Sequence, residues 1–248
     1  MSAEGTISSL RNPAVVAAVG LHRARQRRTT RRTLIEGPSA VEEAINAGVA
    51  VHEMFGIDDA ARSLANGTGA VYHHVTEQVL GRVSGTESPR GPIAVIGLPE
   101  SVIATDRRLL VAWGVSDPGN CGTLLRTAAA FGYGYVAGPE SADSWSPKVL
   151  RSAVGGHFRT TVGEIASLGE LGQREVVGTV PVGGEAAGRV GDRAAIIIGS
   201  EAHGLSPDVL DCCDRVLSIP MPGGVESLNA AVAGAIIAYL GAVGGGDS

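Results

Sequence analysis

The stretch Ala194-Ala195-Ile196-Ile197-Ile198-Gly199-Ser200-Glu201-Ala202-His203-Gly204-Leu205 decides the fold class. Its first five residues are apolar and lack the polar alternation that a half-exposed strand would show. A strand of this kind is covered on both faces, as in a parallel sheet flanked by helices. The residues that follow are polar and glycine-rich, and ligands of such sheets bind beyond the carboxyl ends of the strands. The stretch therefore predicts an α/β protein with a functional site at this strand end.

Similar apolar runs recur through the second half of the chain and alternate with helical patterns. Strands are predicted at 93–96, 109–113, 133–137, 176–180, 194–198 and 215–219, and helices at 120–131, 146–154, 206–213 and 228–241. This alternation is typical of a parallel sheet with helices on its faces.

The first half contains a smaller α/β pattern. Strands are predicted at 49–57 and 70–72, and helices at 59–65 and 76–83, after a short apolar run at 34–36 and a helical pattern at 41–45. Residues 84–92 are rich in turn formers and mark a domain boundary. We therefore expect an Arg-rich segment at 1–32, the remainder of a first domain at 33–85, a linker at 86–92 and a second domain at 93–248.

The composition supports this fold class. Hydrophobic residues make up 44% and charged residues 18% of the chain, as in ordinary globular proteins. Aromatic residues are only 4% while glycine numbers 36, which favours closely packed α/β layers over a β-sandwich. The first five residues lack the basic and apolar regions of a secretory signal, and the three cysteines form no disulfide or zinc pattern. We therefore expect a reduced, cytoplasmic protein without a metal site.

The uncharged stretch 228–246 has nearly the length of a membrane-spanning helix. Its large apolar residues recur at helical spacing with small residues between them, at Leu228, Val232, Ile236, Tyr239 and Leu240. This pattern predicts a buried C-terminal helix, so no membrane partner is expected.

The charge is distributed unevenly. The net charge is -5, but residues 1–32 contain one acid and seven arginines: Arg11, Arg23, Arg25, Arg27, Arg28, Arg31 and Arg32. Arginine pairs with phosphate in a bidentate manner and stacks on bases, so this segment is a candidate RNA-binding arm. The alternative is a solvated, Arg-rich helical face.

Polar, glycine-rich segments follow three of the predicted strands, at 117–128, 199–205 and 220–231. Each has a purely structural alternative. Asn120 and Ser227 are candidate helix caps, and Glu201 is a candidate solvated carboxylate at a helix start. Arg126 lies in an otherwise apolar helix, where we expect it to be paired or functional. Because all three segments occur together at strand ends, a common site is favoured.

The motifs of common nucleotide-binding, metalloprotease and hydrolase sites are absent from the sequence. Instead, three segments resemble the successive motifs of the SpoU (TrmH) family of RNA ribose 2'-O-methyltransferases. They are Asn120-x-Gly-x-x-x-Arg126-Thr-Ala, Gly199-Ser-Glu201-x-x-Gly204-Leu and Ile219-Pro-Met-x-Gly-x-x-Glu-Ser227-Leu-Asn229-x-Ala. Upstream, Asn12-Pro13, 34–37 and 41–44 are similar to the substrate-binding domain of the ribosomal-RNA branch.

This resemblance implies an N-terminal L30e-like α/β domain and a C-terminal SPOUT-type parallel sheet with a trefoil knot. It implies a homodimer that uses S-adenosylmethionine to methylate RNA, most simply ribosomal RNA. The implied cofactor-binding residues are Thr179, Gly199, Gly204, Ile219, Met221 and Leu228. The implied catalytic residues are Arg126, Asn120, Glu201, Ser227 and Asn229, with Arg126 clamping phosphate and stabilising the developing alkoxide. RNA would be bound by Arg23, Arg25, Arg27, Arg28 and Arg31.

Three alternatives remain at this stage. The chain could methylate transfer RNA, although the tRNA-specific members of that family usually lack the N-terminal domain. It could also be a non-catalytic RNA-binding protein that dimerises through its second domain, or an α/β enzyme acting on a small molecule. The combined presence of Arg126, Glu201 and Ser227 argues against the non-catalytic protein, and the N-terminal arginines argue against the small-molecule enzyme.

Overall fold

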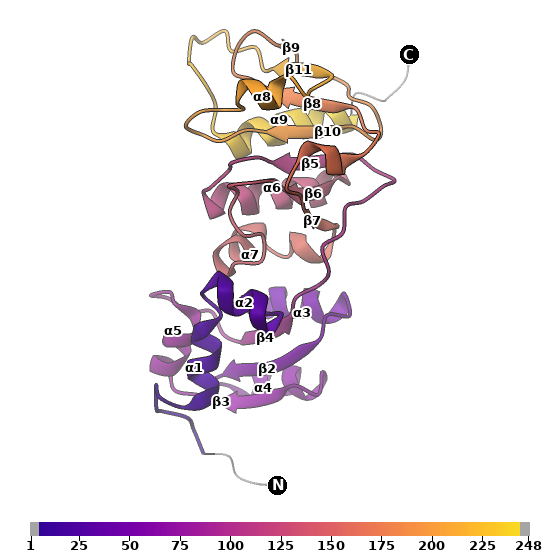
Figure 1. Ribbon diagram of the computed structural model, residues 1–248. Helices are drawn as coiled ribbons and strands as arrows, with labels where there is room; N and C mark the ends of the chain where they lie inside the picture. Colours follow the sequence, from indigo (N-terminus) through magenta and orange to yellow (C-terminus); the bar gives the residue numbers. More distant parts are fainter. Residues whose placement is uncertain (1–4, 244–248) are drawn as a thin grey trace. The chain divides into compact units, whose positions relative to one another are not determined.

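The computed structural model describes residues 5–243 and divides into two compact units. One unit reaches Glu100 and includes Trp145–Arg151, and the other contains Ser101–Ser144 and the residues from Ser152 on. Figure 1 shows the helices and strands of both units.

The N-terminal unit contains a four-stranded sheet in the order β1-β4-β2-β3. Strand β4 is antiparallel to β1 and β2, and β2 is parallel to β3. Its elements are α1 (Pro13–Gly20), α2 (Ala24–Thr30), β1 (Arg32–Glu36), α3 (Pro38–Asn46), β2 (Val51–Gly56), α4 (Asp59–Asn66), β3 (Val71–His74), α5 (Glu77–Ser84) and β4 (Ile93–Gly97). Helices α1 and α5 pack together over a core that includes Val15, Leu34 and Phe55.

The expected domain boundary is wrong. The strand at 93–96 is not the start of the second domain, because β4 lies between β1 and β2 and completes the first sheet. Residues 86–92 are therefore a loop inside the unit rather than a linker between domains. The Arg-rich segment is part of this unit, as expected, because α1 buries Val15 and Ala18 in its core.

The C-terminal unit is built on a seven-stranded sheet in the order β7-β6-β5-β10-β8-β11-β9. All its strand pairs are parallel, which confirms the predicted fold class. The strands are β5 (Leu109–Ala112), β6 (Gly134–Ala137), β7 (Val162–Glu164), β8 (Val176–Thr179), β9 (Glu185–Ala186), β10 (Ala195–Ile198) and β11 (Arg215–Ser218). Its helices are α6 (Pro118–Phe131), η1 (Gly156–Phe158), η2 (Leu168–Leu171), α8 (Pro207–Leu210) and α9 (Ala230–Val243). Helix α7 (Pro147–Ala153) belongs to the N-terminal unit up to Arg151.

The central strands of this sheet are fully buried. All four residues of β5 and of β10 are buried, as the absence of polar alternation predicted. Helices α6 and α9 pack against each other, and both contact the sheet. Gly234 lies at the contact between the two helices, where an added Cβ would collide with Leu124.

Helix α9 is 14 residues long and matches the predicted C-terminal helix, while the last residues of the uncharged stretch, 244–246, lie outside the described residues. No helix within 5–243 is both long and apolar enough to cross a lipid bilayer. One face of α9 is buried, but Val232, Tyr239 and Val243 remain 48%, 51% and 51% exposed.

Candidate active site

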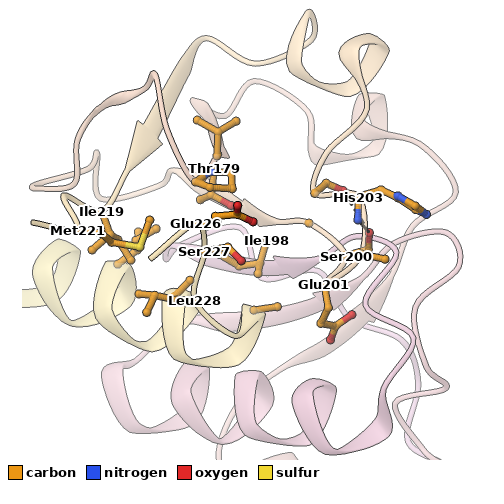
Figure 2. Close-up of a pocket in the computed structure, with 18 residues that line it drawn as sticks. Thr179, Ile198, Ser200, Glu201, His203, Ile219, Met221, Glu226, Ser227 and Leu228 are labelled. Atoms are coloured by element: carbon orange, nitrogen blue, oxygen red, sulfur yellow. Dashed lines mark hydrogen bonds between the residues drawn. The ribbon is translucent and has the colours of Figure 1, made fainter. Parts of the chain in front are cut away.

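A cavity of about 370 Å³ lies where the loops after three neighbouring strands meet. Strands β10, β8 and β11 are adjacent and parallel, so their carboxyl ends lie at the same edge of the sheet. The cavity is lined by Thr179, Val180, Pro181, Ile198, Gly199, Ser200, Glu201, Ala202, His203, Gly204, Ile219, Met221, Glu226, Ser227, Leu228, Ala230, Ala233 and Ile237 (Figure 2). Its volume falls in the range of roughly 300–1,000 Å³ that is typical of small-molecule sites.

The structure brings together all six residues predicted to bind the cofactor. Thr179, Gly199, Gly204, Ile219, Met221 and Leu228 all line the cavity. Of the predicted catalytic residues, Glu201 and Ser227 line it as well. Ser200, His203 and Glu226 also line the cavity; they were not among the predicted site residues, although all three stand inside the second and third motifs.

The loop after β10 is held close to its own start. The Ser200 N–H donates to the Gly204 carbonyl at 3.2 Å, and the Gly204 N–H donates to the Ser200 carbonyl at 3.0 Å. A Cβ added at Gly199 would lie 2.5 Å from the carbonyl carbon of Gly204, so only glycine fits this position. The narrow loop presents backbone groups to the cavity beside the apolar side chains of Ile198 and Leu228.

Three polar side chains, one from helix α6 and two from the loops after β10 and β11, form a hydrogen-bonded row next to the cavity. Asn120 Nδ2 donates to Glu201 Oε1 at 2.5 Å, and Asn229 Nδ2 donates to Asn120 Oδ1 at 3.1 Å. Asn120 belongs to α6, which follows β5, and β5 is the neighbour of β10. The three sequence motifs therefore meet through side-chain contacts.

Neither Asn120 nor Ser227 caps a helix. Asp117, not Asn120, caps α6, because its side chain accepts the Asn120 N–H at 2.8 Å. Asn229, not Ser227, caps α9, since its Oδ1 accepts the backbone N–H groups of Ala231 and Val232. Asn120 and Ser227 are thus free of a capping role, and Asn229 combines capping with its contact to Asn120.

Arg126 does not join this row. Its side chain is exposed and makes no hydrogen bond or ion pair within the part of the chain that the structure describes. It also does not line the cavity, although it lies on the same helix as Asn120. Arg126 was expected to be paired or functional; it has no partner within the described residues and faces solvent, so the functional alternative is the one that stays open.

Cys121 follows Asn120 directly, but its side chain is buried in the core. It is fully buried, and its Sγ lies 3.0 Å from the Val115 carbonyl oxygen. Burial raises the pKa of the Cys121 thiol, so the thiol stays protonated at neutral pH. Cys121 is a packing residue rather than a nucleophile.

The predicted RNA-binding arginines separate into two groups. Arg23, Arg25, Arg28 and Arg31 are exposed around α2. Arg27 is only 3% exposed, and its Nη1 donates to the carbonyl oxygens of Leu21 and His22. The assignment of Arg27 to RNA binding is therefore corrected: this guanidinium holds the chain that leaves α1, and it is not available to a phosphate.

Comparison with known proteins places this geometry in a family. The model of the SpoU rRNA methylase family matches residues 107–239, and the MRM3-like substrate binding domain matches residues 12–94. The chain is 35% identical to the 23S rRNA (guanosine(2553)-2'-O)-methyltransferase RlmP of Bacillus subtilis, over 94% of this chain and 97% of that protein. It is 34% identical to the 23S rRNA (guanosine-2'-O-)-methyltransferase RlmB of Bordetella pertussis, over 68% of this chain and 76% of that protein.

A solved structure agrees with this placement. The SpoU methyltransferase AviRb from Streptomyces viridochromogenes, in complex with AdoMet, superimposes with a TM-score of 0.83 at 25% identity, covering 92% of this chain and 96% of that chain. The family-model match covers the whole cavity and the Glu201–Asn120–Asn229 row. This chain belongs to the SpoU rRNA methylase family.

Proposed function

We propose that this protein transfers the methyl group of S-adenosylmethionine to a ribose 2'-hydroxyl of ribosomal RNA. The observation that carries the proposal is the convergence of the loops after β8, β10 and β11 on one cavity, with the third motif joined to it through the Asn120 contacts to Glu201 and Asn229. The two relatives named above, RlmP and RlmB, are both 23S rRNA guanosine 2'-O-methyltransferases. A guanosine of 23S ribosomal RNA is therefore the proposed substrate class.

The cavity fits the cofactor chemically. Ile198, Ile219 and Leu228 would supply apolar surface for a planar base, and backbone groups of the 199–204 loop would be available to hydrogen-bond it. Thr179 and Ser227 would supply polar side chains for the sugar and amino-acid parts. When bound, S-adenosylmethionine supplies a methyl group on a positively charged sulfonium.

The side chains around the cavity would mainly hold the reactants in line. Positioning of this kind contributes up to ~7–11 kcal/mol to the lowering of a reaction barrier. Asn120 hydrogen-bonds both Glu201 and Asn229, which precedes α9. These two bonds hold the cavity wall in a fixed position against helix α6. Ser227 lies in the cavity wall and would contact the substrate or cofactor.

Arg126 is proposed to bind the RNA at the reacting nucleotide. A guanidinium stays protonated at neutral pH, so it serves as a phosphate clamp and as a positive charge near the 2'-oxygen rather than as a base. Its exposure, without a partner among the described residues, leaves its donors available to RNA. It lies six residues from Asn120, about 9 Å along the helix axis.

The N-terminal unit is proposed to bind the RNA outside the reacting nucleotide. It matches a substrate-binding domain model, and Arg23, Arg25, Arg28 and Arg31 are exposed on it. This domain favours ribosomal over transfer RNA as the substrate. We also infer that the protein acts in the cytoplasm, where it would meet ribosomal RNA.

Two further features of the family are proposed for this chain. A homodimer is supported by Val232, Tyr239 and Val243, which leave an apolar stripe exposed on α9. A trefoil knot is supported by the strand order, because β10 enters the sheet between β5 and β8 although β8 precedes it in the chain.

The test is a transfer assay with tritium-labelled S-adenosylmethionine. Ribosomal RNA from cells that lack the gene, ribosomal RNA from cells that carry it, and bulk transfer RNA serve as substrates. We expect label only in the first RNA, at one position that resists alkaline cleavage because its 2'-oxygen is methylated. Label in transfer RNA alone, or on a base, would contradict the proposal, and absence of any label would favour the non-catalytic alternative.

A further inference from the structure

Glu226 is a carboxylate in the cavity that none of the roles above uses. It lies in the loop between β11 and α9 and lines the cavity. Figure 2 shows its carboxylate between Thr179 and Ser227. The other cavity carboxylate, Glu201, is held by Asn120 at 2.5 Å. Within residues 5–243, Glu226 makes no hydrogen bond or ion pair, so its charge has no counterpart in the chain itself.

The local structure gives Glu226 no architectural task. Helix α9 begins at Ala230 and is capped by Asn229, so Glu226 lies outside the first turn and does not stabilise the helix N-terminus. The side chain is exposed, so it is not needed to satisfy a buried donor. An uncommitted negative charge that faces a cavity favours a ligand that carries positive charge there.

The proposed donor and its product differ in charge at one atom. S-adenosylmethionine has a positively charged sulfonium, and the methyl transfer converts it into the neutral thioether of S-adenosylhomocysteine. The ammonium and carboxylate of the amino-acid part are the same in both molecules. A carboxylate near the sulfur therefore distinguishes donor from product, whereas a carboxylate near the ammonium would attract both equally.

We propose that the Glu226 carboxylate faces the sulfonium of the bound donor and makes the cavity prefer the charged donor over the neutral product. This inference rests on the proposed function. Glu226 does not change the bonds that form and break: the methyl carbon leaves sulfur for the ribose oxygen, the electron pair of the broken bond stays on sulfur as a thioether, and the hydroxyl proton is released to solvent water. Glu226 acts on binding, since its attraction disappears as the positive charge on sulfur disappears.

This placement predicts a specific kinetic pattern. The carboxylate stabilises the charged ground state more than the transition state, in which the sulfonium charge is already declining. Its removal should therefore raise the KM for S-adenosylmethionine without lowering kcat. Removal of the carboxylate should also make the enzyme more sensitive to inhibition by S-adenosylhomocysteine, because the affinity for the donor falls while the affinity for the product does not.

The experiment is isothermal titration calorimetry on the full chain, without RNA, with three ligands. They are S-adenosylmethionine, S-adenosylhomocysteine, and sinefungin, which carries an amine in place of the sulfonium. For Glu226→Gln we expect the Kd of the donor and of sinefungin to rise about three- to tenfold, and that of S-adenosylhomocysteine to change less than about twofold. Asp208→Asn is the matched control, because it removes one negative charge from an exposed residue of α8 that does not line the cavity.

The outcomes separate this inference from the proposed function. If the unaltered chain binds none of the three ligands, the proposed function itself fails. If it binds them and Glu226→Gln weakens donor and product equally, or weakens neither, the function stands and the assignment of Glu226 is overturned. An equal loss of donor affinity in Asp208→Asn would show that the effect comes from the net charge of the protein and not from the position of Glu226. That result would also overturn the assignment of Glu226.

Discussion

Asn120 Nδ2 donates to Glu201 Oε1 at 2.5 Å while the Oδ1 of the same side chain accepts from Asn229, so one carboxamide joins the loops that follow β10 and β11 to helix α6. An amide can do this because it has donors on one atom and an acceptor on the other. Neither a carboxylate nor an aliphatic side chain of similar size can replace it.

This contact predicts a loss of activity without a loss of cofactor binding. Asn120→Ala removes both hydrogen bonds, and Asn120→Asp places a second carboxylate against Glu201. We expect kcat/KM to fall at least about tenfold for both variants, because Glu201 and Asn229 are no longer held in position relative to helix α6. Asn120 does not line the cavity, so calorimetry should show little change in the Kd of S-adenosylhomocysteine. Thr123→Ala, an exposed change on the same helix, is the control.

Arg126 predicts a different pattern. Because its side chain is exposed, Arg126→Ala should change the free energy of unfolding by less than about 0.5 kcal/mol. Methyl transfer should fall roughly 10²–10³-fold, as expected when a charge that stabilises the transition state is removed. Arg126→Lys keeps the charge but loses the bidentate geometry, so it should recover only part of the rate. Undiminished transfer by the Ala variant would remove Arg126 from the mechanism.

The exposed and buried arginines of α2 provide a matched comparison. Replacing Arg25 and Arg28 by Ala should weaken RNA binding and lower the slope of log Kd against log salt by about 1 to 2, since each phosphate contact releases counterions. Arg27→Ala should instead lower the free energy of unfolding by roughly 2–3 kcal/mol, because a buried and a part-buried carbonyl group lose a charged donor. Fluorescence anisotropy and urea unfolding measure the two effects. An unchanged slope in the double variant would refute the RNA contact.

The apolar stripe on α9 predicts the oligomeric state. Tyr239 is 51% exposed and packs edge-to-face on Phe131 with ring centroids 5.8 Å apart. If a second copy covers this stripe, Tyr239→Glu should convert a dimer into a monomer in light scattering coupled to size exclusion. Val182→Glu, at a position 77% exposed in the loop after β8, should leave the mass unchanged. A monomeric unaltered chain would contradict the dimer.

His157 predicts a pH dependence of stability. It is buried and bonded to the Ser144 carbonyl, and burial lowers its pKa from 6.5 to about 4. The unfolded chain therefore takes up a proton first as the pH falls, so stability is fully present above about pH 6.5 and declines towards pH 4. The full loss is roughly 3 kcal/mol. Urea unfolding between pH 7.5 and 4.5 measures it. His157→Gln should flatten the dependence, whereas His203→Gln, an exposed change, should not.

Much of the site could be predicted from the sequence because its parts are local. An apolar run such as 194–198 predicts a buried strand, and the residues that follow it in the sequence lie at the carboxyl end of that strand. In a parallel sheet those ends share one edge, so Gly199, Ile219 and Leu228 were expected near each other and do line one cavity. The sequence left open whether Asn120 and Ser227 cap their helices, and the structure gives these two caps to Asp117 and Asn229 instead.

The remaining features depend on contacts between distant parts of the chain. By itself the sequence determined the element types, the parallel sheet and the loops that carry the chemistry, since these follow from periodicity and chain direction. Only the tertiary structure decided that β4 belongs to the first sheet, that Arg27 is buried while Arg25 is exposed, and that Asn120 bonds Glu201 rather than capping its helix. The physical reason is that strand pairing, burial and side-chain partners are set by which surfaces meet in space, and local residue patterns do not specify them.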